Sequence, residues 1–246
     1  MKKIVLMVLC CMSSLAIGTG RAWSAELTQE KTGLNSQRGG LNENIIKNLF
    51  QSRLSDDGTH YLLDSIEWQE GIFTEKGARE AVVSFYDSNQ CHASNGGELW
   101  LLRYGHDWNM IKKIYEADGV FFETVDVDED GILEIMVYSN SGGQGYDFSK
   151  YELVSLKHGS RSTLYLSEGF DNTGAQEEGE ALCTHSIDFK DIDNDGILEL
   201  IDKVERTQFK WSGKKFESEY IKTSSSVEQI VYKLQHGTFV KTNMKL

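Results

Sequence analysis

The chain has 246 residues, of which 38 are acidic and 25 basic, so its formal charge is −13 at pH 7. So acidic a surface argues against nucleic acid or an anionic membrane as partner and favours metal cations or a basic protein. The sequence contains no proline, so its turns must come from the 23 glycines and from Asn and Asp.

The first 24 residues have the pattern of a secretory signal. Lys2 and Lys3 form a basic start, residues 4–17 are mostly apolar, and residues 22–24 (Ala-Trp-Ser) suit a signal peptidase. The apolar stretch is too short for a transmembrane helix. We expect cleavage, a mature chain without a membrane span, and a secreted or periplasmic location. Losing three basic residues and no acid would change the charge to −13 − 3 = −16.

Two cysteines, Cys91 and Cys183, lie outside this signal segment. An even number of cysteines in an oxidising compartment indicates a bridge, so we expect a disulfide between them. The alternative is a pair of buried free thiols.

One short helix is expected near the N-terminus. Residues 25–40 are polar and Gly-containing, without periodicity, and are typical of a mobile lead-in. After this lead-in, the spacing of five apolar residues places them on one face of a helix: Leu41, Ile45, Ile46, Leu49 and Phe50. Its polar face is not strongly basic, so we expect it to pack against the domain and not on a membrane. Residues 25–57 would thus hold lead-in and helix, and residues 58–246 the main domain.

Two acidic runs share one pattern. Asp126-Val-Asp128-Glu-Asp130-Gly131-Ile-Leu-Glu134 recurs 65 residues later as Asp191-Ile-Asp193-Asn-Asp195-Gly196-Ile-Leu-Glu199. Carboxylates stand at positions 1, 3, 5 and 9 of each run, where they repel one another unless a cation neutralises them. The Gly at position 6 permits a sharp turn, and the carbonyl at position 7 can join the carboxylates. Oxygen ligands without His or Cys favour calcium over zinc.

The residues after each run decide the kind of loop. A helix-loop-helix EF-hand needs a Glu at position 12, but that position holds Val137 in one run and Asp202 in the other. Residues 134–138 and 198–202 are apolar and rich in β-formers. The sequence therefore predicts two strand-loop-strand sites.

Asp-x-Asp-x-Asp-Gly-x-x-Glu followed by a β-rich run resembles the FG-GAP or VCBS-type repeat of integrin-α-like β-propellers. The family usually has Asp at the ninth position, where both copies here have Glu. The resemblance implies two calcium sites with these ligands: Asp126, Asp128, Asp130, the carbonyl of Ile132 and Glu134; Asp191, Asp193, Asp195, the carbonyl of Ile197 and Glu199.

A weaker third copy begins at Ile72 and keeps Gly77 and Glu80. Ile72, Thr74 and Lys76 stand where the first three ligands would be. This copy is expected to have kept the turn and lost the metal, with Lys76 supplying a positive charge in place of a cation.

Hairpin patterns follow each of the three copies. An apolar run, a glycine turn and a second apolar run recur at residues 99–111, 151–166, 209–216 and 230–240. A loop, a strand and a hairpin at intervals of 54 and 65 residues form a blade-like unit. We therefore expect an all-β fold, either a small β-propeller or a propeller-like stack of sheets, with a β-sandwich as the alternative.

The sequence gives little support for catalysis. Its six histidines lack zinc-site spacing, and neither a Gly-x-Ser-x-Gly elbow nor a phosphate-binding Gly-rich loop is present. The Gly-rich segment 139–147 resembles the Ser-Gly-x-x-Tyr loops of periplasmic lysozyme inhibitors, and also propeller-type inhibitors of peptidoglycan hydrolases. That resemblance implies partner contacts by Ser141, Gly142, Gly143 and Tyr146. The alternative is an ordinary inter-strand loop.

These features together predict a secreted or periplasmic calcium-binding β-repeat protein that acts as a protein-binding module. It would not be an enzyme, and its partner would be a basic protein such as a peptidoglycan hydrolase. The alternative is a secreted hydrolase in which calcium is purely structural.

Overall fold

The computed structural model describes residues 40–50, 63–87, 97–143, 146–173, 181–211 and 220–244. The expected signal segment and lead-in up to residue 39, and Cys91, lie outside the described residues. The chain divides into two compact units, and the fold described below belongs to the unit Leu41–Leu246.

One helix, α1 (Glu43–Phe50), precedes a succession of antiparallel strands. The strands are β1 (Leu63–Gly71), β2 (Glu80–Asp87), β3 (Gly97–Tyr104), β4 (Trp108–Ala117), β5 (Gly119–Val125), β6 (Glu134–Gly143), β7 (Tyr146–Ser155), β8 (Ser162–Asp171), β9 (Ala181–Lys190), β10 (Glu199–Trp211), β11 (Tyr220–Gln235) and β12 (Thr238–Lys241). A 3-10 turn, η2 (Lys157–Gly159), lies between β7 and β8. In the described part of the chain, no helix is long and apolar enough to cross a membrane.

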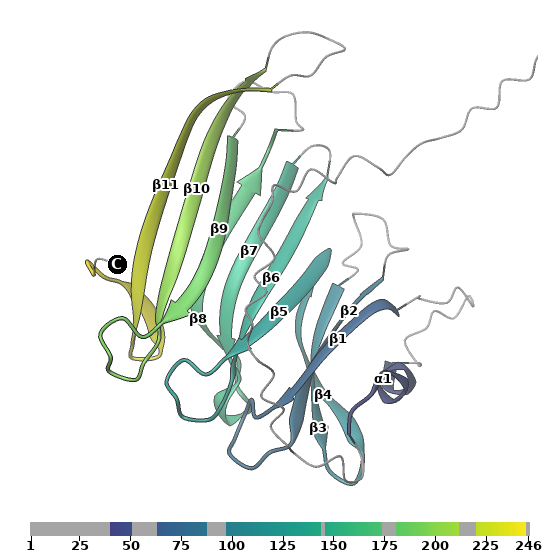
Figure 1. Cartoon of the computed structure of the whole chain (residues 1–246). Helices are drawn as coiled ribbons and strands as arrows, with labels where there is room; N and C mark the ends of the chain where they lie inside the picture. The colour runs from purple at the N-terminus through teal and green to yellow at the C-terminus, as the bar shows by residue number, and fades with distance from the viewer. Residues whose placement is uncertain are drawn as a thin grey trace, which may run out of the picture. The chain divides into compact units, whose positions relative to one another are not determined.

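The described strands form two meandering sheets in which each strand pairs with the next (Figure 1). The first contains β1 to β4 and the second β5 to β12. Within the second sheet, β8 and β9 share only the pairs Phe170↔Cys183 and Asp171↔Leu182. The strands thus fall into three groups of four, called here repeat 1 (β1–β4), repeat 2 (β5–β8) and repeat 3 (β9–β12).

The expected all-β fold with one short helix is confirmed. Separate propeller blades are not confirmed, because repeats 2 and 3 belong to one continuous eight-stranded sheet. The predicted hairpins at residues 99–111, 151–166 and 230–240 are present as the pairs β3–β4, β7–β8 and β11–β12.

Neighbouring strand groups are joined by apolar clusters. Repeat 1 packs on repeat 2 through buried residues that include Phe73, Leu99, Ile135 and Val154. Repeats 2 and 3 share a second cluster, which contains Met136, Leu153, Tyr165, Leu200 and Phe239. Alternate residues of each strand point to opposite faces, so β2 and β3 have a second apolar face that needs its own cover.

Helix α1 supplies that cover. Its Ile46 and Phe50 are buried with Ala81, Val83 and Trp100 in a third cluster. The ring centroid of Phe50 lies 5.6 Å from that of Trp100. The helix therefore packs on the domain as its apolar face predicts, and it closes the outer face of repeat 1.

Three structurally related loops join the first two strands of each repeat, and they lie at the same end of the strands (Figure 1). They are loop 1 (residues 72–79), loop 2 (126–133) and loop 3 (191–198). Leu133 N–H donates to the Ile72 carbonyl at 2.7 Å, and Leu198 N–H donates to the Val127 carbonyl at 2.8 Å. Loop 2 is thus hydrogen-bonded to loop 1, and loop 3 to loop 2. The two acidic runs are therefore neighbours along one edge.

Candidate metal centre

The first aspartate of each acidic run closes its loop. In loop 2, Asp126 accepts the N–H of Asp130 at 3.1 Å and that of Gly131 at 2.8 Å, one on each carboxylate oxygen. In loop 3, Asp191 accepts the equivalent N–H groups of Asp195 and Gly196, both at 3.2 Å. The two runs therefore fold into the same loop, as their common pattern predicts.

The glycine at position 6 is required by the backbone. Gly131 has φ of 81° and Gly196 has φ of 84°, in the left-handed region where a side chain is unfavourable. Gly77 in loop 1 has φ of 85°, so the third copy has kept this part of the turn.

The ninth-position glutamate is buried in all three loops. Glu80, Glu134 and Glu199 each have 0% relative exposure. Each accepts, through Oε2, a backbone N–H from the second loop position: Phe73 at 2.9 Å, Val127 at 3.2 Å and Ile192 at 2.7 Å, respectively. The outgoing strand thus places one glutamate carboxylate under each loop. Its Oε2 holds the loop backbone, and its Oε1 faces the side chain of Arg103, Lys157 or Lys233.

Two carboxylate clusters result, one in loop 2 and one in loop 3. The oxygens of Asp126, Asp128 and Glu134 lie within 4.8 Å of one another, as do those of Asp191, Asp193 and Glu199. Each cluster can hold a metal ion, and each offers oxygen alone. Two of the predicted ligands, Ile132 and Ile197, lie in these loops and donate their N–H groups to the fifth-position aspartates.

Two oxygens in the clusters are buried without a hydrogen bond from any described residue. They are Asp128 Oδ1 and Glu199 Oε1. A buried carboxylate oxygen left unpaired costs free energy, and coordination of a hard cation would remove that cost. The donor set and these two oxygens therefore fit a hard metal cation.

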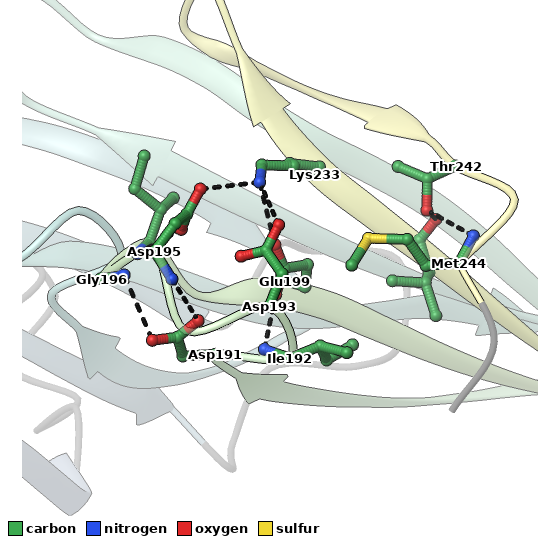
Figure 2. Close-up of polar contacts among 11 residues, drawn as sticks. Asp191, Ile192, Asp193, Asp195, Gly196, Glu199, Lys233, Thr242 and Met244 are labelled. Atoms are coloured by element: carbon green, nitrogen blue, oxygen red, sulfur yellow. Dashed lines mark hydrogen bonds and ion pairs between the residues drawn. The ribbon is translucent and has the colours of Figure 1, made fainter.

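A lysine ammonium reaches into each cluster. Lys157 Nζ lies 2.9 Å from Asp128 Oδ2, 3.0 Å from Asp130 Oδ2 and 3.3 Å from Glu134 Oε1. In loop 3, the positively charged neighbour is Lys233. Its Nζ lies 2.5 Å from Asp193 Oδ2, 2.7 Å from Asp195 Oδ2 and 3.7 Å from Glu199 Oε1 (Figure 2).

These contacts shift several pKa values. Burial raises the pKa of Glu134, and the hydrogen bonds from Val127 and Lys157 oppose it only in part. Burial acts upward on the pKa of Asp130 as well, but there the hydrogen bonds from Lys157 and Ile132 outweigh it and the net shift is downward. The pKa of Lys233 is raised by its hydrogen bonds to Asp193 and Asp195, so this ammonium stays charged at neutral pH.

Loop 1 has a different cation. Arg103 donates to Glu80 Oε1 from Nε at 3.0 Å and from Nη2 at 2.7 Å, and it also bonds Thr74 Oγ1 at 2.6 Å. The sequence suggested Lys76 for this charge, but Lys76 is exposed and the guanidinium beside Glu80 is that of Arg103. Arg103 comes from the adjacent strand β3, which the sequence spacing alone did not indicate.

Strand register explains where each cation originates. Arg103 is paired directly with Glu80. The pair Leu200↔Tyr232 places Lys233 opposite Glu199 in the same way. In repeat 2, by contrast, Ser155 stands opposite the ninth-position glutamate, and Lys157 lies two residues further along. In repeats 1 and 3 the positive side chain thus comes from the third strand, whereas in repeat 2 it comes from the 3-10 turn η2 that follows the third strand.

The predicted partner-contacting residues lie mostly in strands. Ser141, Gly142 and Gly143 end β6, and Tyr146 begins β7 as the register partner of Gly143. Residues 144–145 lie outside the described part. Ser141 also lines a cavity of about 420 Å³ between β4 and strands β6 to β8, together with Tyr115, Asn140, Phe148 and Lys150.

The predicted disulfide stays a prediction, since Cys91 is outside the described residues. Cys183 is buried in β9. Its Sγ lies 3.8 Å from His185 Nε2, and His185 Nδ1 lies 2.9 Å from a carboxylate oxygen of Asp202. Asp202 is 1% exposed and also accepts the Tyr165 hydroxyl at 2.7 Å.

Sequence reasoning missed this buried polar network, because its members come from three strands. His185 Nε2 also lies 3.1 Å from the Glu168 carbonyl oxygen, so both ring nitrogens have partners besides the thiol. The network ties β8, β9 and β10 together where direct pairing between β8 and β9 is sparse.

Comparison of the chain with protein-family models, curated proteins and solved structures gave no match.

Proposed function

We propose that this protein is a calcium-binding β-repeat scaffold of the FG-GAP or VCBS type, with one site in loop 2 and one in loop 3. The observation that supports this most is the convergence of carboxylates over a buried glutamate in both loops, with Asp128 Oδ1 and Glu199 Oε1 left unpaired. Asp126, Asp128, Asp130 and Glu134 would hold one ion. Asp191, Asp193, Asp195 and Glu199 would hold the other.

Charge and donor type favour calcium over other common ions. Each loop brings together four carboxylates and one lysine, a formal charge of −4 + 1 = −3. Calcium accepts six to eight oxygen ligands in variable geometry, whereas magnesium demands a near-octahedral set and zinc prefers nitrogen or sulfur. In this role the ion offsets part of the negative charge of the loops and stabilises the edge along which the repeats are joined.

The scaffold would present a surface to a protein partner outside the cytoplasm. The acidic composition would attract a basic protein, and a peptidoglycan hydrolase belongs to that class. The cavity beside Ser141 supports a binding role, because Phe148 at its rim is 55% exposed. Aromatic side chains of this kind are common anchors at protein interfaces.

A melting experiment tests the calcium sites. Calcium at a hundredfold excess over Kd adds about 2.7 kcal/mol per site, or roughly 5–11 °C in Tm for a chain of this size. We expect calcium to raise the Tm of chelator-treated protein by such steps and magnesium to raise it less. Asp191→Asn should lose about half of the calcium effect, because the amide keeps a loop acceptor but removes a charge.

Asp188→Asn is the matched control, since Asp188 is exposed on β9 and lies outside the loop. Its calcium response should equal that of the wild type. An unchanged Tm on calcium addition to the wild-type protein would contradict the proposal, as would equal losses in the two variants.

The binding role is tested separately in a cell-wall lysis assay with a purified lysozyme. The protein should slow lysis in calcium and less so with chelator, and Tyr146→Ala should weaken the inhibition. Lysis at the same rate with and without the protein would rule out this class of partner.

A further inference from the structure

We infer that Lys157 and Lys233 are internal counter-ions that occupy the cation position of their loops and must be displaced when a divalent ion binds. They would lower calcium affinity and keep the metal-free loops folded. This inference deepens the proposed function and rests on it.

In loop 3 the ammonium contacts the oxygens that a metal would use. Lys233 Nζ lies 2.5 Å from Asp193 Oδ2 and 2.7 Å from Asp195 Oδ2. It approaches Glu199 Oε1 only to 3.7 Å, and that buried oxygen receives no hydrogen bond from a described residue. One ammonium therefore hydrogen-bonds the two aspartates and leaves the buried Glu199 Oε1 without a hydrogen bond.

Loop 2 has an ammonium against the same three loop positions, although the oxygen without a hydrogen bond from a described residue is there Asp128 Oδ1. Lys157 contacts the aspartates at positions 3 and 5 and Glu134 at position 9, the same three positions that Lys233 contacts. Lys233 stands opposite Glu199 within β11, however, whereas Lys157 lies two residues beyond the residue opposite Glu134, in the turn η2 after β7. Two lysines with different sequence positions thus place their charge at the same point in the loop.

Loop 1 offers an internal comparison. Its first three ligand positions hold Ile72, Thr74 and Lys76, and its buried Glu80 is paired with Arg103 by two N–H groups. There two N–H groups of the planar guanidinium converge on Oε1 of the single buried carboxylate, while the N–H groups of Phe73 and Thr74 hold Oε2. In loops 2 and 3 one ammonium faces four carboxylates, so a strong attraction for a divalent ion remains.

The lysines have room to leave. Their side chains are 24% and 25% exposed, and lysine is a point charge on a flexible stem that can turn toward water. An ion and an ammonium at the same point repel each other, so the lysine leaves when the ion enters. Since calcium must also break the contacts between the ammonium and the carboxylates, we expect the lysine to weaken calcium binding by at least about tenfold.

Lysine-to-methionine variants test the inference, because methionine keeps much of the length and removes the charge. In calorimetric titrations, Lys233→Met should bind calcium at loop 3 at least about tenfold more tightly than the wild type, and Lys157→Met should do the same at loop 2. Lys150→Met is the control. Lys150 pairs with Glu152 away from the loops, so its loss should leave both affinities within about twofold.

A labelling experiment on the wild-type protein needs no variant. An amine-reactive ester, read out by mass spectrometry, should label Lys157 and Lys233 several-fold faster in calcium than in chelator, and label Lys150 equally in both. Equal labelling of the loop lysines with and without calcium would show that they are not displaced.

The results separate the inference from the proposed function. If wild-type and methionine variants bind calcium with the same Kd, the calcium sites stand and the lysine competition is wrong. If only the methionine variants bind, the competition stands and the wild-type protein is not a calcium scaffold. If none binds, both are wrong.

Discussion

The pairing of Arg103 with Glu80 predicts a measurable loss of stability when the guanidinium is removed. Arg103→Met deletes two N–H donors from Glu80 Oε1, while the N–H groups of Phe73 and Thr74 still hold Oε2 at 2.9 Å. Hydrogen bonds to a charged group contribute about 1.5–3 kcal/mol, and Glu80 itself is 0% exposed. Because the Arg103 side chain is 37% exposed, water screens part of the pair, and we expect a loss of about 2 kcal/mol.

That loss corresponds to a drop of roughly 4–8 °C in Tm. The assay is urea denaturation and thermal melting in chelator, with Arg206→Met as the control. Arg206 and its partner Glu228 are both about half exposed and 3.4 Å apart, so that variant should lose no more than ~0.5 kcal/mol. If Arg103→Met melts with the wild type, or no lower than Arg206→Met, the guanidinium does not compensate the buried charge of loop 1.

Three further predictions concern other parts of the chain. Phe50→Ala should cost about 3 kcal/mol in urea denaturation, since its ring packs against Phe85 and Trp100; a loss under ~1 kcal/mol would mean that α1 is dispensable. Burial acts upward on the pKa of Glu152, but its hydrogen bond with Thr163 and its other polar partners outweigh burial and lower it. Its folded-state pKa is then below the unfolded one. The stability gap between the wild type and Glu152→Gln should therefore be full at pH 7, shrink as the pH falls below the unfolded value of about 4.3, and be lost once the pH passes below the folded-state pKa. A gap independent of pH would refute this. The exported, non-reduced protein should be about two daltons lighter than its reduced form if the cysteines are bridged, and unchanged mass would show free thiols.

The all-β class, the short helix and the two acidic loops were predictable because their signals are local. An aspartate that caps its own loop and a glycine with positive φ depend on residues within about one turn. The burial of Glu134 and Glu199 is less local, but strand alternation places the ninth residue under the loop once the outgoing strand is recognised.

The cations of the three loops could not be predicted in this way. Arg103 and Lys233 reach the loops from β3 and β11, and Lys157 does so from the turn η2 after β7. Their positions therefore depend on the register of a strand outside the loop's own segment. Lys157 and Lys233 differ by two residues in their position relative to the ninth-position glutamate. An alignment of the repeats would therefore not have matched these two lysines.

The Gly-rich segment shows how one signal can have two physical causes. The sequence suggested an open loop at residues 139–147, but Ser139 to Gly143 belong to β6. A Cβ on Gly142 would collide with the Tyr146 carbonyl and the Asp147 carboxylate. This glycine therefore permits close approach of β6 and β7, and composition alone cannot distinguish that role from a turn.

Calcium titration of the metal-free protein by isothermal calorimetry is the direct test of the two proposed metal sites. We expect saturable binding at two sites, one for each carboxylate cluster. Glu199→Gln, which removes one buried charge under loop 3, should weaken or abolish one site. Glu80→Gln, the matched change under loop 1, should keep both. Two results would contradict the two calcium sites in loops 2 and 3. One is a wild-type titration without saturable heat at any temperature tested, and the other is loss of a site in Glu80→Gln.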